Sequence, residues 1–286
     1  MPIQWYPGHM TGARRAIVES IGAHDVVLEV LDARLPRSSA NPIVGDLRTD
    51  KPRIRLLNKG DLADPDVTAA WVRHYDRTVQ ADPGNGQPPG RAVTLVLGHD
   101  RPGEAKRRIP ALCKELALHP SGPGKTVRAM IVGIPNVGKS TLINALMDRK
   151  VAKVGDEPAV TRSQQRVVLA NGMMLTDNPG MMWPKIENEA AGFRLAFAGA
   201  IPDSAIDYEA VALWGAAFLL ARYPALVTAR FKLPAPPPTA AALLEEIARR
   251  RGGLRRRGAL DLHKAADVLI HDFRTGSLGR ISLESP

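Results

Sequence analysis

Residues 133–140 read GIPNVGKS, and this stretch decides the fold of the domain that contains it. It fits the pattern GxxxxGK[ST], in which glycines let backbone N–H groups curl around phosphate oxygens and the next helix adds the positive end of its dipole. An apolar run at 127–132 (VRAMIV) precedes it, and a helical pattern at 139–148 follows it. This strand–loop–helix context predicts a phosphate-binding loop rather than an ordinary glycine-rich turn.

Other short runs with strand character surround this loop, at 25–31, 53–57, 92–97 and 173–176. They alternate with helical patterns, for example at 103–118, so the sequence predicts an α/β domain with a mostly parallel, doubly wound sheet. The runs at 53–57, 92–97 and 127–132 are apolar enough to predict burial on both faces of that sheet.

The chain changes character at about residue 187, where the strand patterns end. Helical patterns follow at 189–200, 208–222, 239–251 and 261–274. We therefore expect a doubly wound domain over residues 1–185 and a smaller α-helical domain over residues 186–286, with a boundary near Pro184.

Composition limits the partners and the compartment of the protein. Lys and Arg total 39 against 29 for Asp and Glu, and the formal charge of +10 favours polyanions, either nucleic acid or an anionic membrane surface. Cys113 is the single cysteine, which excludes an intramolecular disulfide and suits a reducing cytosol. The most apolar run, 210–221, is too short for a bilayer, which needs roughly 20 residues. We expect a cytoplasmic protein with no membrane insertion.

The base of the nucleotide is indicated by Asn58-Lys59-Gly60-Asp61, directly after the run 53–57. A carboxylate there can accept two hydrogen bonds from N1–H and N2–H₂ of guanine, which adenine does not offer. Alone, the four residues are explained equally well by an Asn/Asp turn. Combined with a phosphate-binding loop, they predict guanine recognition by Asn58, Lys59 and Asp61.

The phosphates and a magnesium ion have predicted ligands in the loop and downstream of it. Lys139 reaches the β- and γ-phosphates, and the Ser140 hydroxyl binds Mg²⁺. Further predicted nucleotide contacts in the same loop are Asn136, Val137, Gly138 and Thr141.

A second string, Asp177-Asn178-Pro179-Gly180, ends the run 173–176. It fits the DxxG motif of GTPases, in which Asp177 supplies a second Mg²⁺ contact and the Gly180 N–H faces the γ-phosphate. The commoner form of this motif has Thr where Asn178 stands. Between loop and DxxG, Thr161 is a candidate for Mg²⁺ and the γ-phosphate, with an ordinary loop residue as the alternative.

The order of these motifs is unusual. Most GTPases read phosphate loop, switch threonine, DxxG and then NKxD, whereas here NKGD at 58–61 precedes the loop at 133–140. Because domain termini often lie close together, a chain can be rewired while its site is kept. The sequence therefore predicts a circularly permuted P-loop GTPase domain followed by a smaller α-helical domain.

The chain resembles the YlqF/RbgA family, the ribosome biogenesis GTPase A group. The matching stretches are WYPGHM (5–10), LDARLP (31–36), NP (41–42), LLNKGDL (56–62), GIPNVGKSTLIN (133–144), SQQ (163–165), DNPG (177–180), WPK (183–185), GAIPD (199–203) and FRTGSLGR (273–280). The resemblance covers essentially the whole chain. It implies GTP-dependent maturation of the large ribosomal subunit, with a C-terminal helical domain that binds rRNA.

The same resemblance bears on hydrolysis. Where many GTPases place a water-orienting Gln, directly after DxxG, this chain has Met181, which cannot polarise water. The family points instead to His9 as the catalytic residue, with packing beside Trp5 and Tyr6 as the alternative. Asn136 resembles the asparagine of potassium-stimulated GTPases, so K⁺ is a candidate cofactor beside Mg²⁺.

One stretch departs from the family. A Ser-Ala motif usually cradles the guanine base after the strand at 92–97, but this chain has Gly98-His99-Asp100. Backbone N–H groups can still reach the base, so Gly98 and His99 stay candidate base contacts.

The C-terminal region contains a dense basic patch. Arg249, Arg250 and Arg251 are followed by Arg255, Arg256 and Arg257. Arginine pairs bidentately with phosphate and stacks on exposed bases, so structured RNA is the predicted ligand, with a solvated basic turn as the alternative.

The motifs predict a GTPase that binds GTP and GDP, and the family resemblance implies a slow one that acts as a switch in late assembly of the large ribosomal subunit. An RNA-binding scaffold that uses GTP as a structural ligand is the alternative. A P-loop ATPase or small-molecule kinase is disfavoured by NKGD.

Overall fold

A computed structural model of the chain describes residues 3–46, 51–81, 92–117, 120, 126–147, 164–251 and 260–286. The chain divides into two compact units. The first, which we call the sheet unit, comprises Trp5–Lys185 and Glu284–Pro286. The second, the helical unit, comprises Met1–Gln4 and Ile186–Leu283.

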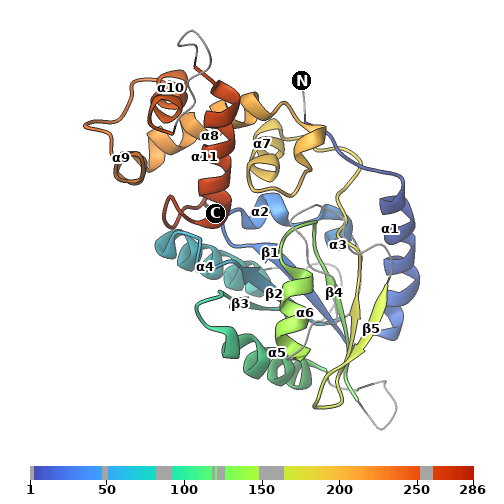
Figure 1. Cartoon of the computed structure of the whole chain (residues 1–286). Helices are drawn as coiled ribbons and strands as arrows, with labels where there is room; N and C mark the ends of the chain where they lie inside the picture. The colour runs from blue at the N-terminus through green and yellow to red at the C-terminus, as the bar shows by residue number, and fades with distance from the viewer. Residues whose placement is uncertain are drawn as a thin grey trace. The chain divides into compact units, whose positions relative to one another are not determined.

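The sheet unit is built on one six-stranded sheet with the order β3-β2-β1-β4-β6-β5 (Figure 1). Its strands are β1 (Val26–Asp32), β2 (Arg53–Asn58), β3 (Ala92–Val96), β4 (Arg128–Val132), β5 (Gln165–Val168) and β6 (Met174–Asp177). All neighbours are parallel except β5, which runs antiparallel to β6. The predicted mostly parallel sheet is therefore confirmed.

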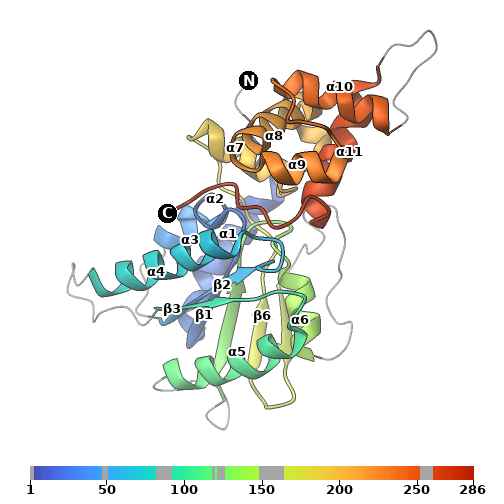
Figure 2. The same ribbon diagram turned by 90° about the vertical axis from the view of Figure 1, so that its left-hand side faces the viewer.

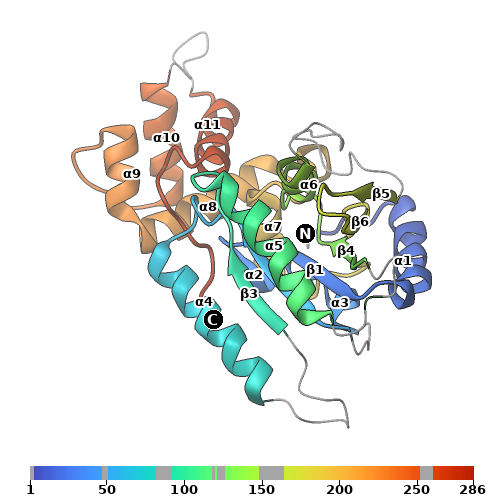
Figure 3. The same cartoon turned by 90° about the horizontal axis from the view of Figure 1, so that it is seen from below.

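Helices cover both faces of this sheet. They are α1 (His9–Ser20), the 3₁₀ turn η1 (Ile21–Ala23), α2 (Pro36–Ser39), α3 (Pro42–Asp46), α4 (Pro65–Ala81), α5 (Pro102–Leu116) and α6 (Lys139–Met147). Figures 2 and 3 show α5 and α6 on one face and α1, α3 and α4 on the other. Helices on both faces are what the doubly wound prediction requires.

Burial follows the position of each strand in the sheet. Every residue of the central strand β1 is buried, including Glu29, whose carboxylate lies 3.6 Å from Arg53 and 3.9 Å from Arg55 of β2. The prediction of burial on both faces fits β4, but it is wrong for β3, where Leu95 alone is buried. The reason is that β3 lies at the sheet edge, which an apolar sequence does not reveal.

The side on which further strands are added to the sheet changes between β1 and β4. From β1 the strands proceed through β2 to β3, whereas from β4 they proceed through β6 to β5 on the opposite side. In open α/β sheets ligands bind outside the carboxyl ends of the strands at this switch point. Strand β4, which leads into the GIPNVGKS loop, comes after β2, which leads into NKGD, as a circular permutation requires.

The helical unit contains α7 (Glu189–Phe197), the turn η3 (Asp203–Ala205), α8 (Tyr208–Arg222), α9 (Pro224–Phe231), α10 (Ala240–Arg250) and α11 (Leu262–Thr275). The N-caps of four helices are side-chain acceptors, as helix starts require, and are supplied by Asn188, Asp207, Thr239 and Asp261. Helix α8 is central, because it packs against α7, α9, α10 and α11. The helical patterns predicted here are confirmed, and α9 is an additional helix.

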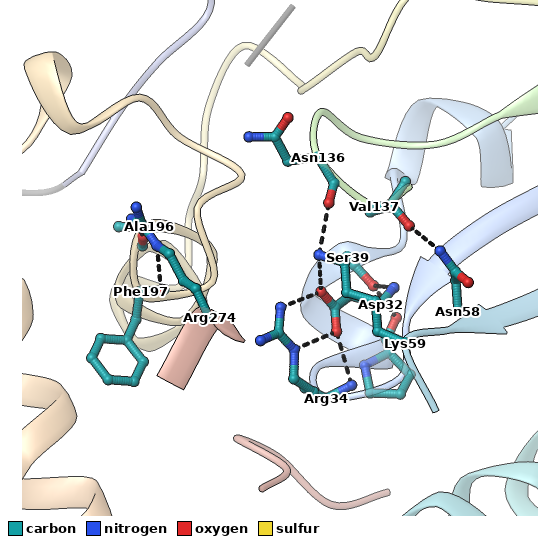
Figure 4. A network of polar contacts seen from close by, with 11 residues as sticks. Asp32, Arg34, Ser39, Asn58, Lys59, Asn136, Val137, Ala196, Phe197 and Arg274 are labelled. Carbon is teal, nitrogen blue, oxygen red and sulfur yellow. Dashed lines mark hydrogen bonds and ion pairs between the residues drawn. The ribbon is translucent and has the colours of Figure 1, made fainter. Parts of the chain in front are cut away.

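Arg274 of α11 connects two stretches, FRTGSLGR and GAIPD, to which the sequence alone gives no structural role. Its guanidinium donates to the carbonyls of Ala196 (2.9 Å) and Phe197 (3.1 Å) at the end of α7 (Figure 4). It also pairs with Asp203 at 2.8 and 3.0 Å. FRTGSLGR and GAIPD therefore meet at one helix C-terminus, where a cation is favourable.

No single helix in the described ranges is long and apolar enough to span a bilayer. The pair α8 and α9, bent by 112° at its break, meets that test by length and composition alone.

Candidate nucleotide site

The backbone of the GIPNVGKS loop curves so tightly that side chains at its two glycines would collide with neighbouring atoms. Gly133 and Gly138 have positive φ angles of 158° and 93°, and Asn136 adopts the left-handed conformation at 57°. A Cβ atom at Gly133 would lie 2.6 Å from the Val30 carbonyl, and one at Gly138 would collide with the Asn58 amide. Glycine is therefore required at both positions to leave the loop its curved backbone.

Lys139 begins α6 and turns back into the loop. Its ammonium donates to the carbonyl oxygens of Gly133 (3.0 Å) and Ile134 (2.8 Å). Burial lowers the pKa of Lys139 to about 8, while the nearby Asp177 carboxylate opposes that shift. An anion in the loop would favour the charged ammonium, because an opposite charge nearby raises the pKa of a lysine.

Asp177, at the end of β6, has the properties of a cation ligand. Both of its carboxylate oxygens are buried, and neither has a hydrogen-bond partner among the described residues. Burial raises its pKa to about 6, and the Lys139 ammonium acts against this rise. A divalent cation would satisfy these oxygens, so the residues present fit magnesium.

The structure describes one of the other two predicted magnesium ligands. Ser140 lies in the first turn of α6, whereas Thr161 lies outside the described residues. The described ranges hold no cluster of three or more His, Cys, Asp or Glu.

The NKGD string and the phosphate-binding loop are in direct contact, although their residues are 77 and 79 positions apart in the chain. The Asn58 amide donates to the Val137 carbonyl at 2.7 Å, and the Lys59 ammonium donates to the Asn136 carbonyl at 2.7 Å. The structure thus brings together two motifs that the sequence places far apart.

Asp32 completes this junction and is missed by sequence reasoning. It ends β1, which lies between the strands of the two motifs, and its Oδ2 is 3.0 Å from the Lys59 ammonium (Figure 4). Arg34 holds the same carboxylate through Nε (2.9 Å) and Nη2 (2.8 Å). Burial alone would raise the pKa of Asp32, but Arg34 and Lys59 hold it well below its usual range. In the sequence, the LDARLP stretch is the sign of Asp32 and Arg34.

The predicted base contacts also converge. The Gly60 N–H donates to the Leu97 carbonyl at 2.7 Å, and a Cβ at Gly98 would lie 3.1 Å from that of Asp61. Asp61 Oδ1 is buried and has no hydrogen-bond partner in the described part of the chain, as an acceptor intended for a ligand would. His99 is exposed.

The DxxG string packs on the phosphate-binding loop. A Cβ at Gly180 would lie 2.8 Å from Pro135 Cα and 3.1 Å from the Lys139 ammonium nitrogen. Met181 is buried, and its carbonyl accepts a hydrogen bond from the Asn41 amide at 2.6 Å. Its side chain therefore serves packing, which agrees with the absence of a water-orienting group at that position.

Two sets of predicted residues are only partly placed. Helix α1 begins at His9, but the His9 side chain lies outside the description, so its catalytic role stays a prediction. In the basic patch, Arg249 pairs with Glu245 (3.0 Å) and Glu246 (2.6 Å), and Arg250 pairs with Glu246 at 3.4 Å. Arg251 is exposed, and Arg255, Arg256 and Arg257 lie outside the described residues.

The sheet is mostly parallel, the phosphate-binding loop follows strand β4, and NKGD precedes that loop in the chain. Together these features define a circularly permuted P-loop GTPase domain. A family profile described as "50S ribosome-binding GTPase" matches residues 128–208. Ribosome biogenesis GTPase A of Bacillus licheniformis is 43% identical over 290 residues, covering 100% of this chain and 99% of that protein. The chain belongs to the ribosome biogenesis GTPase A family.

More distant relatives agree. Ribosome biogenesis GTPase A of Thermotoga maritima is 30% identical, covering 99% of this chain and 95% of the relative. The structure of GNP-bound YlqF from T. maritima matches with a TM-score of 0.63 and 26% identity over 96% of this chain and 98% of that one. The GDP-bound structure of the same protein has a TM-score of 0.64 and 27% identity, over 95% and 99% of the two chains.

Proposed function

We propose that this GTPase binds GTP and GDP and hydrolyses GTP as a switch in late assembly of the large ribosomal subunit. One observation carries the nucleotide part of the proposal: three buried carboxylate oxygens, Oδ1 of Asp61 and both oxygens of Asp177, have no hydrogen-bond partner among the described residues. Asp61 lies at the guanine end and Asp177 at the phosphate end. A guanine nucleotide with its magnesium ion supplies the missing partner of each.

Each residue of the site has a separate task in binding. Asp61 accepts the two guanine N–H groups, and the Asn58 and Lys59 side chains hold this base loop against the phosphate-binding loop. Lys139 and the loop N–H groups contact phosphate, and the Gly180 N–H faces the γ-phosphate. Bound Mg²⁺, held by Asp177, Ser140 and Thr161, would neutralise charge on the β- and γ-phosphate oxygens.

Hydrolysis needs a group that orients water. Met181 is buried at the position where many GTPases have Gln, which supports the assignment of this task to His9 at the start of α1. Asn136, beside the phosphates, is the proposed ligand for K⁺, whose charge would assist in place of an arginine finger.

The ribosomal part of the proposal rests on the named relatives and on charge. A net charge of +10 favours a polyanion, and the basic patch at the end of α10 is the proposed contact with rRNA. GTP would raise affinity for the particle, and hydrolysis would release the protein.

The base assignment is tested by nucleotide titration of the full chain. Wild type should prefer GDP over ADP by about 10⁴-fold, because a site built to bond a group rejects analogues that lack it. Asp61→Asn should weaken GDP binding by on the order of 100-fold, since one acceptor oxygen becomes an NH₂ donor that faces a guanine N–H and the remaining bond loses its charged acceptor. Asp66→Asn, an exposed change of the same kind, is the control. Equal binding of ADP and GDP would support an ATPase instead.

The switch assignment is tested by GTP turnover in potassium buffer with and without purified large ribosomal subunits. We expect slow turnover that rises with the particle. Binding to the large subunit that depends on GTP, without any turnover, would support the scaffold alternative. Binding to the large subunit that is equally strong with and without nucleotide would contradict the switch.

A further inference from the structure

The DxxG string contains a side chain that works as a connector. Asn178 is fully buried, and its Nδ2 donates to the Ile131 carbonyl on β4 at 2.9 Å. Its Oδ1 accepts a hydrogen bond from Gln164 Nε2 at 2.7 Å. Ile131 also pairs with Asp177 in the β4–β6 ladder, so Asn178 extends this ladder beyond the end of β6.

Gln164 passes the connection on to helix α1. The same Nε2 lies 3.0 Å from Ser20 Oγ and 3.3 Å from the Ala16 carbonyl. Ser20 Oγ donates in turn to the Ala16 carbonyl at 2.6 Å. One side chain therefore joins the carboxyl end of β6, which holds Asp177, to the helix that begins at His9.

The geometry explains why Asn replaces the commoner Thr at position 178. A planar amide presents a donor and an acceptor in opposite directions, and Asn178 uses both, toward β4 and toward Gln164. A threonine side chain is shorter and carries a single polar atom. Its hydroxyl can both donate and accept, but it lies one bond closer to the backbone, so we expect the Gln164 amide to lose its bond to position 178.

We propose that Gln164 and Asn178, which we call the amide pair, are positioning residues that keep α1 in register with Asp177 for the hydrolysis step. This inference rests on the proposed GTPase function. The amide pair does not touch nucleotide; it fixes the distance between the element that carries the water-orienting residue and the element that carries the cation ligand. Its loss should therefore affect kcat and the magnesium response more than nucleotide binding.

The test uses the full chain with Gln164→Met, which keeps the length of the side chain and removes its hydrogen bonds. The matched control is Gln165→Met at the adjacent, exposed position. We expect kcat to fall by about 100-fold in Gln164→Met, the effect of roughly 1 Å of misplacement, with KM changed less than about twofold. Gln165→Met should match wild type.

A second readout does not require turnover. GDP affinity is measured in EDTA and in excess Mg²⁺, and the gain produced by Mg²⁺ should shrink in Gln164→Met and in Asn178→Thr while affinity in EDTA stays the same. The double variant should be no worse than Gln164→Met alone, because either change breaks the same connection.

Three results would overturn the inference. One is a Gln164→Met variant whose kcat, and whose increase in GDP affinity on addition of Mg²⁺, equal those of Gln165→Met. Another is a parallel loss of Tm, affinity in EDTA and kcat, which would show that the amide pair only stabilises the fold. The third is additive effects in the double variant. Absence of turnover in wild type would count against the proposed function instead, and the magnesium gain would still test the amide pair.

Discussion

Asp32 is the residue on which the junction between base loop and phosphate loop depends. Its buried carboxylate is shared by the buried Arg34 guanidinium and the Lys59 ammonium, and Lys59 in turn bonds the Asn136 carbonyl. Replacing one member of a buried ion pair removes charge that its partners still need, at a cost of about 3–5 kcal/mol.

We therefore expect Asp32→Asn to lower the free energy of unfolding by about 3–5 kcal/mol and to weaken GDP binding, measured by urea unfolding and by titration. The control is Glu19→Gln, which breaks the solvent-exposed pair with Arg15 and should leave stability close to that of wild type. Similar effects of both changes would show that the Asp32 network is energetically unimportant.

His24 makes stability depend on pH. It is buried, with Nδ1 2.8 Å from the Ser20 carbonyl and Nε2 2.8 Å from Thr176 Oγ1. Burial lowers its pKa, although the Ser20 carbonyl opposes this. The unfolded chain then binds the proton at a higher pH than the folded chain does. The His24 contribution is complete above the unfolded pKa of about 6.5 and declines as pH falls toward the folded pKa.

The expected result is a steeper loss of stability for wild type than for His24→Gln between about pH 7.5 and 5.5, by up to about 1.4 kcal/mol per pH unit. Urea unfolding at several pH values measures it, and comparison with the variant cancels the other titrating groups. His263→Gln, which changes an exposed histidine, is the matched control. Parallel curves for wild type and His24→Gln would contradict the assignment.

The sequence reveals site residues that lie in one contiguous string and misses those that meet only in space. The phosphate-binding loop, NKGD and DNPG are recognisable because backbone curvature and ligand chemistry fix residue types at fixed spacings. The Asp32–Lys59 ion pair and the Gln164–Asn178 hydrogen bond depend on which strands are neighbours, which no single string encodes.

At the scale of elements, helix α8 tolerates no side chain at Gly215. A Cβ atom there would overlap the ring of Phe197, which packs in turn on Phe273 with ring centroids 4.5 Å apart. Alanine favours a helix over glycine by up to about 1 kcal/mol, but overpacking a core costs about 1–3 kcal/mol.

Gly215→Ala should therefore lower the stability of the protein despite its better helix propensity, as urea unfolding followed by circular dichroism would show. Gly12→Ala in α1 is the matched control, because open space surrounds a Cβ there, and it should be neutral or stabilising. A stabilising Gly215→Ala would mean that the Phe197 ring moves without loss.

Elements are predictable in proportion to their burial. The sequence predicts the helix at 208–222 with its observed bounds, since a long apolar pattern between charged residues defines it. It does not predict strand β5, because this antiparallel edge strand exposes Gln165, Arg166 and Val168, so no apolar pattern marks it. Edge strands carry polar residues that resemble those of loops.

At the scale of the whole molecule, the charge of +10 predicts how RNA binding responds to salt. Log affinity should fall linearly with log salt concentration, with a slope set by the number of phosphates neutralised. Replacing Arg249, Arg250 and Arg251 together by Gln should lower that slope by about one for each phosphate that these arginines neutralise.

The control for this measurement is Arg15→Gln with Arg73→Gln and Arg77→Gln, an equal loss of charge at exposed positions of the sheet unit. It should leave the slope unchanged. An equal reduction by both triple variants would mean that net charge, rather than the basic patch, attracts RNA.

The position of β1 between β2 and β4 has a consequence for synthesis. Translation delivers β4 about 100 residues after β1, a delay of roughly 5–20 s at about 5–20 residues per second. During that interval β1, buried along its whole length in the finished sheet, lacks its neighbour on one side. A nascent chain halted before Arg128 would therefore present an open, apolar strand edge, the kind of surface that chaperones bind. The permuted order thus makes emergence of the phosphate-binding strand the event that covers the open edge of β1.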